Sequence, residues 1–245
     1  MLVIVPQCAP EARVPPEVPA RCEPERVRTA ERRLSLIVSE VFYSLQGEAS
    51  RMGLPSVFIR LTGCPLRCAW CDTAYAFTGG RRMNLATILD AVAGYGARQV
   101  CVTGGEPLAQ KNCLALITSL CDAGYEVSLE TSGALDIGVV DPRASRIVDV
   151  KAPGSGESAR NRWQNLSLLG PRDELKFVLA NRADYEWAGR VIAEHGLERR
   201  CPILFSPVQE MLTPVDLAEW ILADRLPVRF QLQLHKRLWG NMRGK

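Results

Sequence analysis

Three cysteines lie close together in the stretch GCPLRCAWCDT, residues 63–73. Cys64, Cys68 and Cys71 are spaced by four and three residues, and no fourth cysteine follows nearby. Thiolates suit both zinc and iron–sulfur clusters. A structural zinc ion needs four closed ligands, whereas three thiolates on a four-iron cluster leave one iron open to another molecule. The spacing therefore predicts a metal-binding loop that lacks one protein ligand.

Zinc remains an alternative at this point, as the centre of a zinc-stabilised binding module. Few residues could supply the fourth ligand. His195 and His235 are the only histidines, and His195 precedes Gly196 at an expected helix end, where a solvated cap residue is expected. The remaining cysteines of the folded region, which lie in or beside expected core elements where packing is their expected role, are Cys101, Cys113, Cys121 and Cys201.

A second motif, Thr103-Gly104-Gly105-Glu106-Pro107, follows at a distance. With the cysteine loop it resembles the pair of motifs found in radical S-adenosylmethionine (SAM) enzymes, in the same order and at a similar separation. The resemblance implies a [4Fe–4S] cluster on the three cysteines and SAM bound to the open iron. Gly104 and Gly105 carry no side chain, so the backbone can approach the SAM ammonium group closely.

The elements that must hold these motifs alternate between strands and helices. Apolar runs predict strands at 57–61, 100–103, 127–130, 147–150, 175–179, 203–206 and 229–234, and helical periodicity is found at 85–98 and 108–123. Thr213 with Pro214 and Asp216 is typical of a helix start. This alternation indicates an α/β fold with a parallel sheet, in the form of an incomplete TIM-like βα barrel. The unusual residues follow the strands, at the edge where such sheets carry their chemistry.

The first 33 residues differ in composition from the rest. They hold six of the 16 prolines and alternate Arg with Glu, which predicts a flexible tail at 1–33 ahead of one domain at 34–245. Cys8 and Cys22 in this tail are expected to have no role.

Composition narrows the setting of the protein. A net charge of +3 over 245 residues predicts neither a nucleic-acid nor a membrane partner. The apolar run MLVIV ends at Pro6, too short for a secretory signal, so a cytoplasmic location is expected. In that reducing compartment nine cysteines indicate metal or redox chemistry more than disulfides.

Further motifs resemble the 7-carboxy-7-deazaguanine synthase family, from about Ser39 to about Gly240. They are LQGE at 45–48, FIRLTGC at 58–64, CDT at 71–73, DVKAPGSG at 149–156, ELKFV at 174–178 and QLQLHK at 231–236. The resemblance implies conversion of 6-carboxy-5,6,7,8-tetrahydropterin to 7-carboxy-7-deazaguanine, on the way to queuosine and other deazapurines. It also implies Mg²⁺, a homodimer and a flavodoxin- or ferredoxin-like electron donor.

The same resemblance assigns roles to individual residues. Thr73 is the expected Mg²⁺ ligand. Arg60 offers a planar fork for the substrate carboxylate, and Glu48 can accept hydrogen bonds from the pterin. Arg243, near the end of the chain, could face the place where some members of the family bring their terminal carboxylate. The full set of expected substrate contacts is Leu45, Gln46, Gly47, Glu48, Arg60, Thr103 and His235, and the expected SAM contacts are Gly104, Gly105, Glu130, Ser132, Lys151, Ser206 and Gln209.

The implied reaction begins with hydrogen abstraction from substrate C6, continues with ring contraction assisted by Mg²⁺, and ends with loss of ammonia. An alternative within the superfamily is a small activase that makes a glycyl radical on a partner protein. Such an enzyme would share the cysteine loop and the GGEP segment. It would not require Gln46, Glu48, Arg60 and Thr73 together.

Overall fold

The computed structural model describes residues 34–245, so the expected tail at 1–33, with Cys8 and Cys22, lies outside the described residues. Within the described range the strands form one nine-stranded sheet in the order β3-β1-β2-β4-β5-β6-β7-β8-β9. The strands are β1 (Ser35–Leu45), β2 (Pro55–Leu61), β3 (Arg81–Asn84), β4 (Gln99–Gly104), β5 (Glu126–Thr131), β6 (Ser145–Val150), β7 (Glu174–Leu179), β8 (Ile203–Pro207) and β9 (Arg229–Phe230).

Helices connect the strands. The α-helices are α2 (Leu85–Ala93), α3 (Cys113–Asp122), α4 (Arg182–His195), α5 (Pro214–Asp224) and α6 (Leu234–Trp239). Short 3-10 turns are found at Ala74–Ala76, Pro107–Ala109, Pro153–Ser155, Ser158–Arg160, Trp163–Leu168 and Leu197–Arg199. No helix in residues 34–245 has both the length and the apolar character needed to cross a bilayer.

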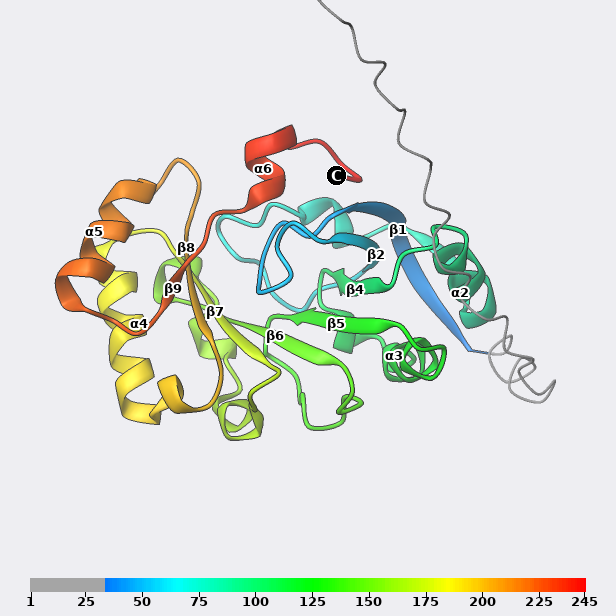
Figure 1. Ribbon diagram of the computed structural model, residues 1–245, viewed down its shortest axis with the longest axis horizontal. Helices are drawn as coiled ribbons and strands as arrows, with labels where there is room; N and C mark the ends of the chain where they lie inside the picture. The colour runs from blue at the N-terminus through cyan, green and yellow to red at the C-terminus, as the bar shows by residue number, and fades with distance from the viewer. Residues whose placement is uncertain (1–33) are drawn as a thin grey trace, which may run out of the picture.

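β2 and the strands from β4 to β9 run parallel: β2 is hydrogen-bonded to β4, and each later strand is hydrogen-bonded to the next. Figure 1 shows them in an open, curved row, with α2 and α3 near one end and α4 and α5 near the other. All carboxyl ends of these strands lie at one edge, which positions their terminal residues together. The predicted incomplete βα barrel is confirmed.

Two strands were not expected from the sequence. β1 pairs antiparallel with β2 and with β3, and it extends the sheet beyond the barrel strands. Along β1 the buried positions alternate only at its start, with Leu36 and Val38, and the later positions are half-buried apart from Tyr43, which is exposed. β1 ends beside the first residue of β2, so the loop at 46–54 leaves from the amino edge of the parallel strands, and Ser50 in it donates a hydrogen bond to Glu174 at the start of β7. Residues 46–48 of this loop line the cavity described below, so β1 contributes directly to the site.

Two apolar clusters hold the helices on the sheet. One packs α2 and α3 against β1, β2, β4 and β5, and the other packs α4 and α5 against β6, β7 and β8. Cys113 is fully buried and Cys121 packs at the edge of the first cluster, as expected for packing residues. Thr213 caps α5 by accepting a hydrogen bond from the backbone N–H of Asp216, and this predicted helix start is confirmed.

Some element boundaries were predicted wrongly. The expected strand at 229–234 pairs only at Arg229–Phe230, and α6 begins at Leu234. Between them the side-chain amide of Gln231 exchanges two hydrogen bonds with the backbone of Ala49, at 2.8 and 3.1 Å, which replaces strand pairing with a side-chain bridge. The expected helix at 85–98 ends at Ala93, directly before Gly94. The expected helix at 108–123 is a 3-10 turn followed by α3.

Candidate active site

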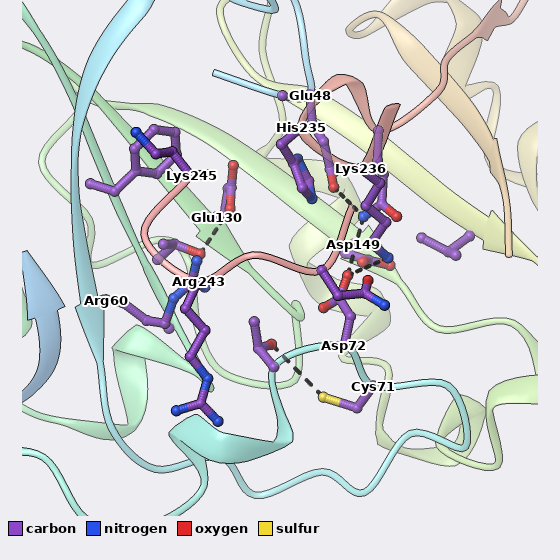
Figure 2. Close-up of a pocket in the computed structure, with 18 of the residues that line it drawn as sticks. Glu48, Arg60, Cys71, Asp72, Glu130, Asp149, His235, Lys236, Arg243 and Lys245 are labelled. Carbon is purple, nitrogen blue, oxygen red and sulfur yellow. Dashed lines mark hydrogen bonds and ion pairs between the residues drawn. The ribbon is translucent and has the colours of Figure 1, made fainter. Parts of the chain in front are cut away.

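A cavity of about 660 Å³ opens at the carboxyl edge of the parallel strands. Figure 2 shows charged side chains that converge on it from both sides, with Cys71 at its floor in that view. The sequence-predicted site residues that line it are Leu45, Gln46, Gly47, Glu48, Arg60, Cys68, Cys71, Thr73, Thr103, Gly104, Glu130, Ser132, Lys151, Gln209 and His235. The predicted residues that do not line it are Cys64, Gly105 and Ser206.

The cysteine loop leaves β2 through Gly63, whose φ of +98° suits glycine. The backbone carbonyl of Gly63 accepts a hydrogen bond from the N–H of Glu106 at 2.7 Å, and the N–H of Gly63 donates to Ala76 at 2.8 Å. Cys64, Cys68 and Cys71 are each partly exposed. Three accessible thiols on one loop, two of them facing the cavity, fit the donor set of a cluster with one open iron.

Gly104 and Gly105 lie where the backbone passes very close to its neighbours. A Cβ on Gly104 would lie 2.3 Å from the carbonyl oxygen of Leu61, and one on Gly105 would lie 2.3 Å from that of Gly63 and 2.8 Å from Cβ of Cys64. The absence of a side chain at Gly105 therefore allows the cysteine loop to pack directly against this backbone. Gly104 lines the cavity, so it is the glycine of this pair that a ligand can approach.

Glu106, the acidic residue of the TGGEP motif, is fully buried. Its carboxylate accepts hydrogen bonds from the hydroxyl of Thr131 at 2.9 Å, from the hydroxyl and backbone N–H of Ser132 at 2.5 and 2.8 Å, and from the N–H of Leu108 at 3.0 Å. Glu106 thus connects the end of β4 to the end of β5. Sequence reasoning expected Ser132 to contact SAM but assigned no partner to Glu106.

Glu130 links residues that the sequence placed in different groups. Its carboxylate accepts from the side-chain amide of Gln46 at 3.2 Å and from the hydroxyl of Thr103 at 2.8 Å. Gln46 and Thr103 are expected substrate contacts, whereas Glu130 is an expected SAM contact. The boundary between the two expected subsites therefore runs along the side chain of Glu130.

A network of buried charges crosses the cavity. Lys176 on β7 donates a hydrogen bond to Glu48, and its Nζ lies 3.7 Å from Oδ2 of Asp149, which is also 3.0 Å from Nζ of Lys151. Burial opposes the ionisation of Glu48, but the Lys176 ammonium outweighs it and holds the pKa of Glu48 below its usual value. Burial likewise opposes the charge of Lys176, yet Glu48 and Asp149 raise its pKa.

Sequence reasoning missed Lys176 and Asp149 as site residues. The two are register partners in neighbouring strands, and both line the cavity. The available signal was a single charged residue inside each of two apolar runs, LKFVL and IVDV. Oδ1 of Asp149 is buried and has no hydrogen-bond partner among residues 34–245, so the protein leaves this acceptor unsatisfied.

The segment from Gln231 onward covers one side of the cavity. His235 packs on Gly47, where a Cβ would lie 2.1 Å from Nδ1 of His235. Lys236 pairs with Asp72 of the cysteine loop at 2.7 Å, and Gln233 donates to Glu48 at 2.6 Å. Burial lowers the pKa of His235, with Glu48 and Asp72 opposing it. Residues 240–245 line the cavity beyond α6, and the Arg243 guanidinium carbon lies 3.9 Å from the centre of the Tyr75 ring.

The remaining predicted residues have simpler surroundings. Thr73 lines the cavity, and its hydroxyl oxygen lies 3.9 Å from the sulfur of Cys71, which is too far for a strong hydrogen bond. Ser206 is buried in β8, opposite Val178 of β7, which lines the cavity, but Ser206 itself is not a lining residue. His195 is exposed at the end of α4 and stacks on Trp163, with ring centres 5.7 Å apart, which agrees with its expected position at a helix end.

Comparisons with known proteins show the class of enzyme to which this chain belongs. Residues 58–200 match the family model of the radical SAM superfamily. The 7-carboxy-7-deazaguanine synthase of Chlorobaculum tepidum is 48% identical over 84% of this chain and 94% of its own length. That of Koribacter versatilis is 43% identical over 82% and 96%. The crystal structure of QueE from Escherichia coli superposes with a TM-score of 0.69 at 25% identity, covering 85% of this chain and 98% of that one.

The chain belongs to the 7-carboxy-7-deazaguanine synthase family of radical SAM enzymes. The resemblance read from the motifs is thereby confirmed, and with it the predicted enzyme class. A [4Fe–4S] cluster and SAM are the cofactors that membership of the superfamily implies. Neither of the alternatives, an activase or a zinc-stabilised module, is the class to which these relatives belong.

Proposed function

We propose that this protein converts 6-carboxy-5,6,7,8-tetrahydropterin to 7-carboxy-7-deazaguanine with release of ammonia, the reaction of the family to which it belongs. The observation that carries the proposal is the convergence, in one cavity of about 660 Å³, of the cysteine loop with hydrogen-bonding groups suited to a flat, carboxylated heterocycle. Glu48 and Arg60 reach this cavity from different sides (Figure 2), so two ends of such a molecule would each have a complementary group.

The cofactors fit the residues around the cysteine loop. Cys64, Cys68 and Cys71 would hold the cluster, and SAM would occupy the adjoining part of the cavity at Gly104, Glu130, Ser132, Lys151 and Gln209. Gly105 and Ser206 would support this subsite from behind. When bound, the two cofactors supply the radical that removes hydrogen from the substrate. The protein's part is to hold the substrate in place and to exclude water and other hydrogen donors.

Substrate recognition would divide among three groups of residues. Arg60 would hold the carboxylate through two of its N–H donors. Glu48, kept ionised by Lys176, would accept from the amino and ring N–H groups of the pterin, with Gln46 and Thr103 beside it. His235, placed by Gly47, would contact the ring from the side of α6, and Leu45 would border the rim.

Thr73 is the proposed protein ligand of Mg²⁺. Mg²⁺ prefers oxygen ligands and keeps several waters, so one hydroxyl together with substrate oxygens can suffice. Thr73→Ser should keep the Mg²⁺ stimulation of turnover, and Thr73→Val should abolish it. Equal stimulation of both variants would remove Thr73 from the Mg²⁺ site.

Several further assignments complete the proposal. Residues 34–245 would carry the catalytic domain, with the tail ahead of it. A one-electron donor of the flavodoxin or ferredoxin type would reduce the cluster, and a reducing, cytoplasmic setting would keep the three thiols free. A homodimer is the proposed assembly. Light scattering after gel filtration of the full chain tests the last of these.

The deciding experiment is turnover by the full chain, reconstituted with iron and sulfide without oxygen and supplied with SAM, Mg²⁺, a chemical reductant and carboxytetrahydropterin. We expect mass spectrometry to find the ring-contracted acid in amounts above the SAM consumed. A fully loaded enzyme that cleaves SAM but leaves the pterin unchanged would reject the proposed substrate and would favour another radical SAM reaction.

A further inference from the structure

Arg60 faces an acidic residue across the pair formed by β1 and β2. The strand register shifts between Val38 and Glu40, and Glu40 then pairs with Arg60. Residues that lie opposite each other in an antiparallel pair project from the same face of the sheet, and register shifts of this kind re-aim a side chain. Nε of Arg60 donates a hydrogen bond to Oε1 of Glu40 at 2.8 Å.

The same carboxylate oxygen of Glu40 has a second donor. The hydroxyl of Tyr75, which follows the cysteine loop, donates to Oε1 at 2.8 Å. An ionised carboxylate only accepts hydrogen bonds, so Arg60 and Tyr75 are both donors to this one oxygen. Arg60 and Tyr75 line the cavity, whereas Glu40 does not.

The aromatic rings of Phe42 and Tyr75 bound the guanidinium. Its central carbon lies 5.8 Å from the centre of the Phe42 ring and 5.9 Å from that of Tyr75. Apart from the bond to Glu40, Arg60 makes no side-chain hydrogen bond within the described part of the chain. With Nε occupied, the terminal amino groups Nη1 and Nη2 are the donors left for an anion that enters the cavity.

We propose that Glu40 is a positioning residue, which acts through Arg60 to present the two terminal amino groups of the guanidinium to the substrate carboxylate. Tyr75 holds Glu40 in the orientation that this requires. The inference rests on the proposed function, since it concerns the carboxylate of that substrate. An unrestrained arginine loses considerable side-chain entropy when it binds, and Glu40 removes part of that loss before the substrate arrives.

A double-mutant cycle tests whether Glu40 orients Arg60 for the substrate or only stabilises the fold through a cross-strand ion pair. In the full-length, cluster-loaded enzyme, Glu40→Ala should raise KM for carboxytetrahydropterin roughly tenfold, the size expected for a weakened charged hydrogen bond, with little change in kcat. Arg60→Ala should raise KM further. Adding Glu40→Ala to Arg60→Ala should then have no additional effect, because Glu40 acts only through the arginine.

Two conservative variants keep the test valid if Glu40→Ala folds poorly. Glu40→Gln retains an acceptor for Nε of Arg60, so it should raise KM only about two- to threefold. Tyr75→Phe keeps the ring and removes the hydroxyl, with an effect of similar size. 6-Methyltetrahydropterin lacks the carboxylate and can be measured as a competitive inhibitor. Its binding should be the same in the wild type and in Glu40→Ala, Glu40→Gln and Tyr75→Phe.

The matched control is Glu126→Ala. Glu126 is the first residue of β5 and, like Glu40, pairs with an arginine: it lies 2.7 Å from Arg98. It does not line the cavity. It should leave KM unchanged. The inference is overturned if Glu40→Ala acts equally in the Arg60→Ala background, or if it weakens the inhibitor that lacks a carboxylate. If the wild type gives no ring-contracted product, the proposed function fails first, and the inference fails with it.

Discussion

Lys176 and Glu48 form an ion pair although 128 residues separate them in the sequence. One partner is part of a central strand, β7, and the other belongs to the loop that follows β1. Both side chains are largely buried and line the cavity. Under the proposed function, Glu48 accepts hydrogen bonds from the pterin at both carboxylate oxygens, which requires the ionised form. We therefore expect Lys176 to contribute to substrate recognition without contact with the substrate.

Replacing Lys176 tests this dependence through pH. The pKa of Glu48 is held low by Lys176 against burial, and Lys176→Met should therefore raise it. Because the ionised form is the one that binds, the acidic limb of the kcat/KM profile should move to higher pH, and the loss should be larger at pH 6 than at pH 8. Lys176→Arg keeps the charge and should keep the profile near that of the wild type. An acidic limb that does not move in the methionine variant would contradict the role given to Glu48.

The low pKa of Glu48 also has a consequence for stability. A carboxyl whose pKa is lower in the folded than in the unfolded chain stabilises the fold above its unfolded pKa, and this contribution is lost as pH falls through the folded pKa. The denaturation midpoint of the wild type should therefore fall more steeply on acidification than that of a Glu48→Gln/Lys176→Met double variant. Parallel curves would mean that the pair does not contribute to acid sensitivity.

The three cysteines of the loop should be individually essential for iron. Cys64→Ala, Cys68→Ala and Cys71→Ala should each lose most of the roughly four irons expected per chain, together with the brown colour of the cluster. Cys121→Ala, on a partly exposed thiol of α3, should retain both. Iron and sulfide analysis of anaerobically purified protein measures this. A zinc content of one per chain, with no iron in the wild type, would contradict the assignment of the loop.

Gly105 should be required beneath the cysteine loop. Gly105→Ala introduces a Cβ at 2.3 Å from the Gly63 carbonyl, so the loop must shift, with an expected loss of about 1–3 kcal/mol in the free energy of unfolding and a lower iron content. Gly189→Ala is the control, because no neighbouring atom lies within 4 Å of its added Cβ and its position inside α4 favours alanine. Wild-type iron content in Gly105→Ala would show that the loop can accommodate the change.

Glu106 should stabilise the apo protein as well as the holoenzyme. Glu106→Ala leaves the buried donors of Thr131, Ser132 and Leu108 without their acceptor, which should cost about 2–5 kcal/mol in the free energy of unfolding. Urea denaturation of the cluster-free chain measures this. Glu219→Ala, at an exposed position of α5, should change the same quantity by less than about 0.5 kcal/mol. Equal effects of the two substitutions would mean that the Glu106 hydrogen bonds have no net value.

The sequence was most informative where the chemistry is local. Cys64, Cys68 and Cys71 lie on one loop, and the glycines of the TGGEP motif adjoin one strand end, so their spacing alone predicts the class of site. The parallel strands were recognisable because strands buried on both faces are continuous apolar runs. β1 was not, since most of its length is half-buried and carries Glu40, Tyr43 and Ser44 among its apolar residues.

The missed parts of the site depend on contacts between distant segments. Nothing local to Lys176 indicates that Glu48 will lie beside it, and the pairing of Lys236 with Asp72 depends on where α6 packs. The short strand β9 was overestimated because QLQL alternates like a strand, whereas the amide of Gln231 binds the backbone of Ala49 instead. Such side-chain bridges are invisible to a periodicity argument.

Residues 240–245 form part of the cavity wall, and this has a practical consequence for handling the protein. An affinity tag or fusion partner appended after Lys245 would begin at the cavity wall and compete with small molecules for the same space. A tag at the other end reaches the fold through Leu34, which is not a lining residue. Kinetic work on this enzyme should therefore use amino-terminal tags, and low activity of a carboxy-terminally tagged form should be attributed first to an obstructed cavity.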